Sequence, residues 1–218
     1  VREEAACARS SDFMPGVLQN NIPAFTLFAM FFVVIPLAGS IINEKTHGTF
    51  DRMRTLPVSF FQVTAAKVML FVTVCTLQFL FLLFVGKYIM PLLGEKSTFD
   101  MHVSIPALAA AVLSSSLAAT GFGILTGAFA ATHGQAATFG SVMVVILALL
   151  GGIFVPVHVL PETLRNISYV SPLRWGTDAF LGVFARHSGP AGILTEVSLL
   201  TGFFIISILL SIRKFSKR

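Results

Sequence analysis

Long apolar stretches alternate with polar connections along most of this chain. Five of these stretches are long enough to cross about 30 Å of hydrocarbon as an α-helix that rises about 1.5 Å per residue. They cover residues 22–42, 68–86, 105–131, 138–157 and 192–212. The pattern predicts an all-α fold, a polytopic transmembrane helix bundle with five spans.

The segment between the fourth and fifth spans, residues 158–191, is too polar to cross a membrane and too apolar for a simple loop. Trp175 and Tyr169 within it belong to residue types that favour the membrane–water interface. We therefore expect short interfacial helices at the outer surface. An irregular external loop is the alternative. The apolar positions that favour helices are Leu160, Leu164, Ile167, Leu173, Trp175, Phe180 and Phe184.

Composition supports a membrane location. Hydrophobic residues make up 55% of the 218 residues and charged residues only 11%, a balance that is unusual for a soluble domain. The net charge of +5 does not indicate nucleic-acid binding, because the basic residues are distributed over several connections and the C-terminal end. Membrane lipids are the partners that this distribution favours.

The basic residues also predict an orientation. The connection 43–67 contains Lys45, Arg52, Arg54 and Lys67, and residues 213–218 form a basic tail. The positive-inside rule places both in the cytoplasm. Residues 1–21 and 158–191 would then lie outside, the former as the end of an upstream segment. An external start without a signal peptide needs an earlier span. We therefore expect six spans in the intact transmembrane domain, of which this chain contains the part at residues 22–212.

Ionisable residues are nearly absent from the predicted spans, where only Glu196 occurs near the outer end of the fifth. Secondary transporters and proton pumps usually need such groups inside the membrane. The sequence also has no phosphate-binding loop, no zinc-protease motif and no histidine or cysteine spacing typical of a metal site. We expect no catalytic residue, no metal and no ATP hydrolysis by this chain. Energy for any transport would come from elsewhere.

Small and mildly polar residues inside the spans allow two interpretations. The polar ones could line a path for an amphipathic substrate, or they could bond to neighbouring helices and backbone carbonyls. They are Thr73, Thr76, Gln78, Ser114, Ser115, Ser116 and Thr120. Ala119, Gly123 and Gly127 recur at four-residue spacing, which predicts a face that another helix approaches closely.

The connection 43–67 contains a short amphipathic segment. Phe50, Met53 and Leu56 recur every three residues beside Arg52 and Arg54, and Pro57 ends the segment. A short helix of this kind can dock in a groove of a soluble partner. A helix on the membrane surface fits the spacing equally well.

These residues resemble the signature of the type-2 ABC exporter permeases. In that signature an acidic and a basic residue precede Gly-Thr, an amphipathic turn, a Pro-polar pair and a later lysine. The matching residues here are Glu44, Lys45, Gly48, Thr49, Pro57, Val58, Ser59 and Lys67. The resemblance extends to Met14-Pro15-Gly16, to the Gly-Gly-Ile-Phe-Val-Pro run of residues 151–156, and to Leu160-Pro161 and Ser171-Pro172.

The resemblance implies a permease in the cell (inner) membrane that pairs with a second permease copy or homologue and two cytoplasmic ABC ATPase subunits or domains. Those partners would bind ATP and Mg, and this chain would bind no cofactor. Its expected role is export of an amphipathic or hydrophobic substrate. The implied ATPase-coupling loop consists of Glu44, Lys45, Gly48, Thr49, Phe50, Arg52, Met53, Arg54, Leu56 and Pro57. The apolar side chains of Phe50, Met53 and Leu56 would fill a groove of the ATPase.

Two other classes remain open on the residues alone. A passive channel also tolerates uncharged spans, and it would transport without ATP. A membrane-embedded enzyme or assembly factor is the second, although no pair of candidate catalytic groups converges in the sequence.

Overall fold

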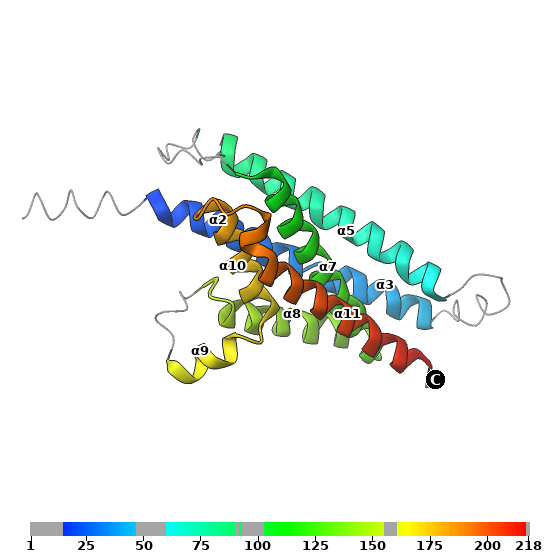
Figure 1. The fold of residues 1–218 in the computed structure, drawn as a ribbon. Coiled ribbons are helices and arrows are strands. Elements are labelled where there is room, and N and C mark those ends of the chain that lie inside the picture. Colours follow the sequence, from blue (N-terminus) through cyan, green and yellow to red (C-terminus); the bar gives the residue numbers. More distant parts are fainter. Residues whose placement is uncertain (1–14, 47–59, 90–91, 93–102, 155–160, 217–218) are drawn as a thin grey trace, which may run out of the picture.

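The computed structural model describes residues 15–46, 60–89, 92, 103–154 and 161–216 (Figure 1). These residues form helices and connecting turns, with no strand among them. The predicted all-α bundle is therefore confirmed. The elements are α2 (Pro15–Phe31), α3 (Val34–Thr46), α5 (Phe60–Phe84), the π-helical turn η1 (Val85–Ile89), α7 (Ile105–Phe129), α8 (His133–Leu150), α9 (Glu162–Ser168), α10 (Pro172–Phe184), the 3-10 turn η3 (Pro190–Ile193) and α11 (Leu194–Ser216).

Five helical segments in the described part of the chain are long and apolar enough to cross a membrane, as predicted. They are Ile22–Thr46, Gln62–Ile89, Ile105–Phe129, His133–Leu150 and Pro190–Lys214. The fourth differs most from its predicted range of 138–157, because it begins at His133 and ends at Leu150. Gly151 caps it, and Gly152 follows with a φ of 79°, a backbone conformation that L side chains rarely adopt.

The first span consists of two helices rather than one. Pro36 has no N–H group to donate to Phe32 O, and the N–H of Ile35 donates to that carbonyl instead, at 3.1 Å. The N–H of Val33 likewise bonds three residues back, to Met30 O, at 3.2 Å. This tightened turn separates α2 from α3, and the apolar pattern alone did not predict it.

α7 runs through the middle of the bundle and packs against α11, α3 and α5 (Figure 1). Its side chains are small on the sides that meet these helices. Ala111, Ala118 and Ala119 are completely buried, and Gly121 lies against Phe204 of α11. Small residues permit this close packing, which is the main source of attraction between helices in lipid.

In the described part of the predicted interfacial stretch, residues 161–191, the chain forms the short helices α9 and α10 rather than an irregular loop. α9 exposes Leu164 and Ile167. α10 instead packs against α2 and α11 and buries Leu173, Phe180 and Phe184. Phe180 stacks on Phe79 of α5, with ring centroids 5.3 Å apart.

Candidate coupling site at the loop end of the bundle

The loop end of the bundle is the end at which α3 finishes and α5 begins. It holds Glu44 and Lys45, the first two residues predicted for the coupling loop. The remaining predicted loop residues lie outside the described residues. These are Gly48, Thr49, Phe50, Arg52, Met53, Arg54, Leu56 and Pro57. The structure thus defines the flanks of the loop.

An ion pair joins these flanks. Lys67 Nζ of α5 lies 2.8 Å from Glu44 Oε1 of α3, and it also donates to Ser40 Oγ at 2.8 Å. The side chain of Lys67 is 13% exposed and that of Glu44 25%, so water screens this pair less than a surface pair. Glu44 Oε2 is buried and has no hydrogen-bond partner among the described residues. The Glu44 carboxylate therefore has remaining capacity to accept a donor.

Lys45 makes a different contact. Its ammonium group donates to Gly127 O at 2.6 Å and to Ala128 O at 2.9 Å, both in the last turn of α7. The last carbonyls of a helix have no N–H partner within the helix, and they carry the negative end of its dipole. Lys45 therefore satisfies two carbonyls with a charge of the favourable sign, and it attaches the end of α3 to the end of α7.

The small-residue face of α7 lies against α3. A Cβ added to Gly123 would lie 2.7 Å from Leu37 Cδ2, and one added to Gly127 would lie 3.1 Å from the Cα of Ala38. Ala119 is completely buried on the same helix. The two helices approach this closely because neither glycine has a side chain, and the approach brings Lys45 within reach of the α7 carbonyls.

Most of the mildly polar span residues bond within their own helices. Thr73 donates to Met69 O, Thr76 to Val72 O, Ser114 to Ala111 O, Ser116 to Val112 O and Thr120 to Ser116 O. Ser115 Oγ is buried without a partner among the described residues. The hydrogen bonds favour a structural role for this set over a polar path.

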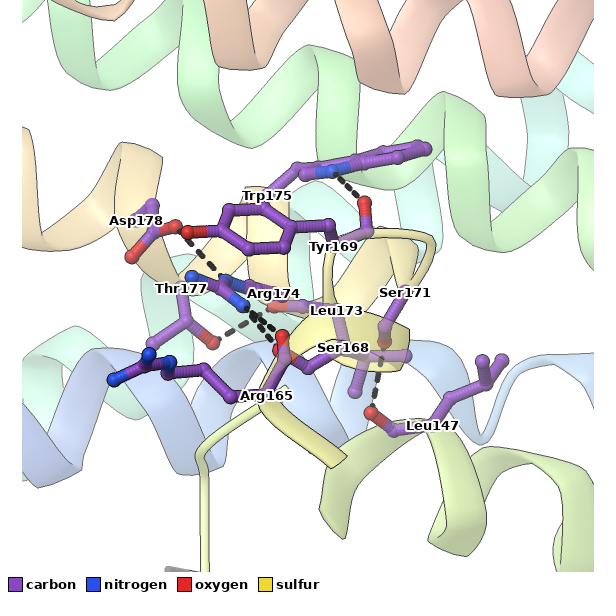
Figure 2. Close-up of polar contacts among 10 residues, drawn as sticks. All are labelled: Leu147, Arg165, Ser168, Tyr169, Ser171, Leu173, Arg174, Trp175, Thr177 and Asp178. Atoms are coloured by element: carbon purple, nitrogen blue, oxygen red, sulfur yellow. Dashed lines mark hydrogen bonds and ion pairs between the residues drawn. The ribbon is translucent and has the colours of Figure 1, made fainter. Parts of the chain in front are cut away.

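A second polar cluster lies on α9 and α10, at the opposite end of the bundle (Figure 1), and its contacts are drawn in Figure 2. The guanidinium of Arg174 donates to Ser168 Oγ and to Arg165 O, the latter at 3.1 Å, and lies 3.8 Å from the ring centroid of Tyr169. It also contacts Asp178 Oδ2 at 3.7 Å. This cluster fixes the angle between the two short helices. The sequence pattern did not predict this cluster, because it joins residues of two separate helices whose relative placement only the fold decides.

Two further contacts hold this unit in place. Trp175 Nε1 donates to Tyr169 O at 2.8 Å, and Ser171 Oγ donates to Leu147 O of α8 at 2.9 Å (Figure 2).

Burial raises the pKa of the Asp178 carboxyl, and the positive charges of Arg174 and Arg186 oppose that rise. In the part of the chain that the structure describes, no three His, Cys, Asp or Glu residues are grouped as metal ligands.

Comparison with known proteins gives a consistent assignment. Residues 9–185 match the family model of the ABC-2 type transporter. The linearmycin resistance permease protein LnrN of Bacillus subtilis (strain 168) is 24% identical over 83% of this chain and 46% of its own length. The probable multidrug ABC transporter permease YbhR of Escherichia coli (strain K12) is 28% identical over 72% of this chain and 40% of its own length. No solved structure matches the chain significantly.

The chain spans less than half the length of these curated relatives. The family match nevertheless covers most of the residues, including both flanks of the predicted coupling loop and the α9–α10 unit. The chain therefore belongs to the ABC-2 type transporter family, and its described residues form spans of an integral membrane protein.

Proposed function

We propose that this chain is part of an ABC transporter permease that exports an amphipathic or hydrophobic substrate from the cytoplasm, driven by ATP hydrolysis on an ABC ATPase partner. Family membership implies that partnership. ATP and Mg would bind to the ATPase, and this chain would contribute no catalytic residue. One relative is named for linearmycin resistance and the other as a probable multidrug transporter, which supports a drug-like cargo.

The attachment of the loop flanks carries the proposal. Glu44 pairs with Lys67 of α5, while Lys45 binds the end of α7. A force applied to the connection 43–67 would therefore reach three helices through short polar contacts. Closure of an ATPase pair against this connection would move packed helices as rigid bodies, as in other transporters with alternating access.

The proposal also fixes the orientation. The protein would lie in the inner membrane of the cell. The connection 43–67 and the basic tail 213–218 would face the cytoplasm, and α9 and α10 would lie at the outer side. A second permease copy or homologue would complete the transport path. The central parts of the spans carry almost no charge, and the Glu44–Lys67 pair lies at their loop end, which supports an energy source outside the membrane segment.

Copurification of the full-length protein from nanodiscs tests this function. In one variant a Gly/Ser linker replaces Gly48 to Pro57. In the control an equal linker replaces residues 93–102, a segment of the same length between η1 and α7. We expect an ABC ATPase to accompany the parent and the control and to be lost from the first variant. A folded parent without an ATPase would overturn the proposal and would favour a passive channel or an assembly factor.

A further inference from the structure

Lys45 lies at the junction between the coupling loop and the bundle. It is in the last turn of α3, one residue before the end of that helix. Its two acceptors belong to a helix 82 and 83 positions away in the sequence. Any displacement of the loop flank that moves the Lys45 ammonium therefore acts on the end of α7 at once.

The end of α7 is firmly linked to the start of α8. The N–H of Ala130 donates to Thr126 O and completes the last turn of α7. The next residues form a reciprocal cap, in which Gln135 N donates to Thr132 Oγ1 at 3.2 Å and Ala131 N donates to Gln135 Oε1 at 2.9 Å. Residues 130–135, the α7–α8 turn, are therefore well ordered by their own hydrogen bonds and can transmit movement from α7 to α8.

α3 contacts the same turn at a second point. The imidazole of His133, the first residue of α8, covers Gly39 so closely that a Cβ there would lie 2.6 Å from His133 Nδ1. Gly127 in turn packs against Ala38 and Ile41. These apolar contacts hold the helices together, whereas the Lys45 bonds are directional and act at the edge next to the loop.

Another lysine provides an internal comparison. Lys214 is exposed on α11, and its ammonium lies 5.3 Å from the ring centroid of Phe129, the last residue of α7. It brings a positive charge to the same helix end as Lys45. Its contact is with an aromatic ring, while Lys45 binds backbone carbonyls.

We propose that Lys45 is a positioning residue that couples the loop to the α7–α8 turn, and that this turn moves during the ATPase cycle. The inference rests on the proposed function, since it needs an ATPase that acts on the loop. The α7–α8 turn would then be a second moving element at the loop end of the bundle. Movement of the end of α7 would displace α8 through the backbone that joins the two helices.

A spin label in the turn tests this proposal. Gly134 is a suitable site, because a Cβ there would meet nothing within 4 Å. The label is attached to the Gly134→Cys variant in a background with Cys7 and Cys75 replaced by alanine, in the full-length complex with its ATPase. Label mobility and transport per ATP hydrolysed are measured with and without ATP and vanadate. We expect a clear ATP-dependent change in the parent.

In the Lys45→Met variant, both the label response and transport per ATP hydrolysed should fall about fivefold or more, which is the low end of typical coupling between sites. Lys45→Arg should retain the response, and the Lys214→Met control should match the parent. Lys45→Gln, whose amide still donates, should give an intermediate response, and it carries the test if the methionine variant does not fold.

A full parental response in Lys45→Met or Lys45→Gln would overturn the proposal. So would a turn that does not respond to ATP in a parent complex that contains the ATPase. Equal losses in the Lys45 and Lys214 variants would also overturn it, because they would show an effect of charge alone. A parent that binds no ATPase would instead refute the proposed function.

Discussion

Lys67 Nζ lies 2.8 Å from Glu44 Oε1, so that one ion pair closes the base of the connection between α3 and α5. Both residues belong to the loop signature. In the sequence, 22 residues lie between them, and these include the start of α5. Their contact holds the two flanks of the connection together. Ser40 adds a second acceptor for the same ammonium, which orients the pair.

Exchange of the two charges tests this pair. Glu44→Lys and Lys67→Glu should each lower substrate-stimulated ATPase activity, because each places like charges together at a partly buried site. The double exchange should restore part of the lost ATPase activity. In the free energy of unfolding, the two residues should show an interaction energy of about 0.5–3 kcal/mol, as is usual for residues in contact. A thermal-stability cycle on the four proteins measures this energy. Strictly additive effects would show that the pair contributes nothing.

Charge reversal at Arg52 and Arg54 tests the docking role of the loop. The double variant to Glu should insert in the membrane normally, because these residues are outside the spans, but it should weaken coupling to the ATPase. Substrate-stimulated ATPase activity in nanodiscs measures the effect. Arg213→Glu, which reverses an exposed charge on the C-terminal part of α11, is the control. Unchanged stimulation in the loop variant would contradict its proposed role.

Gly123→Ala should destabilise the bundle by about 1–3 kcal/mol, the usual effect of adding a methyl group to a packed interior. The new Cβ would lie 2.7 Å from Leu37 Cδ2 and would push α3 away from α7. Gly134→Ala is the matched control, since its Cβ meets nothing within 4 Å, and its effect should stay below about 1 kcal/mol. Thermal unfolding in detergent compares them. Equal stability of the two variants would contradict the close approach.

Arg174→Lys should loosen α9 although the charge is retained. A lysine cannot bond Ser168 Oγ and Arg165 O in the plane of a guanidinium while stacking over Tyr169. We expect faster amide hydrogen exchange in α9 and an unchanged rate in α3, at the other end of the bundle. Exchange that remains as slow as in the parent would show that the stack and the fork of hydrogen bonds are dispensable.

Asp178 should give the protein a pH dependence of known sign. Burial raises its pKa, with a further rise from Glu196 and opposing effects from Arg174 and Arg186. In the window from the ordinary aspartate pKa up to the raised one, the folded state binds the proton more strongly than the unfolded chain, so stability falls as pH rises. Asp178→Asn should remove this fall. Thermal midpoints across the window measure it, and an identical slope in both proteins would argue against it.

The sequence by itself determined the class of the protein, the number of spans and the position of the loop. These follow from the length of the apolar runs, because a helix in lipid must satisfy its backbone internally over the whole hydrocarbon thickness. The loop signature also identified Glu44, Lys45 and Lys67. Their separate contacts, one to α5 and one to the end of α7, could not be read from spacing.

Only the tertiary structure decided where these side chains bind and how α2 separates from α3. The Lys45 contact depends on Gly123 and Gly127 allowing α3 to approach, and the Arg174 cluster depends on how α9 is placed relative to α10. Both contacts join two segments of the chain, and the local apolar pattern of a segment does not show which other segment lies beside it. Spans such as α5 and α7 are apolar on all sides, so their sequence does not show which face is buried; that face and its partner are set by the packing of the whole bundle.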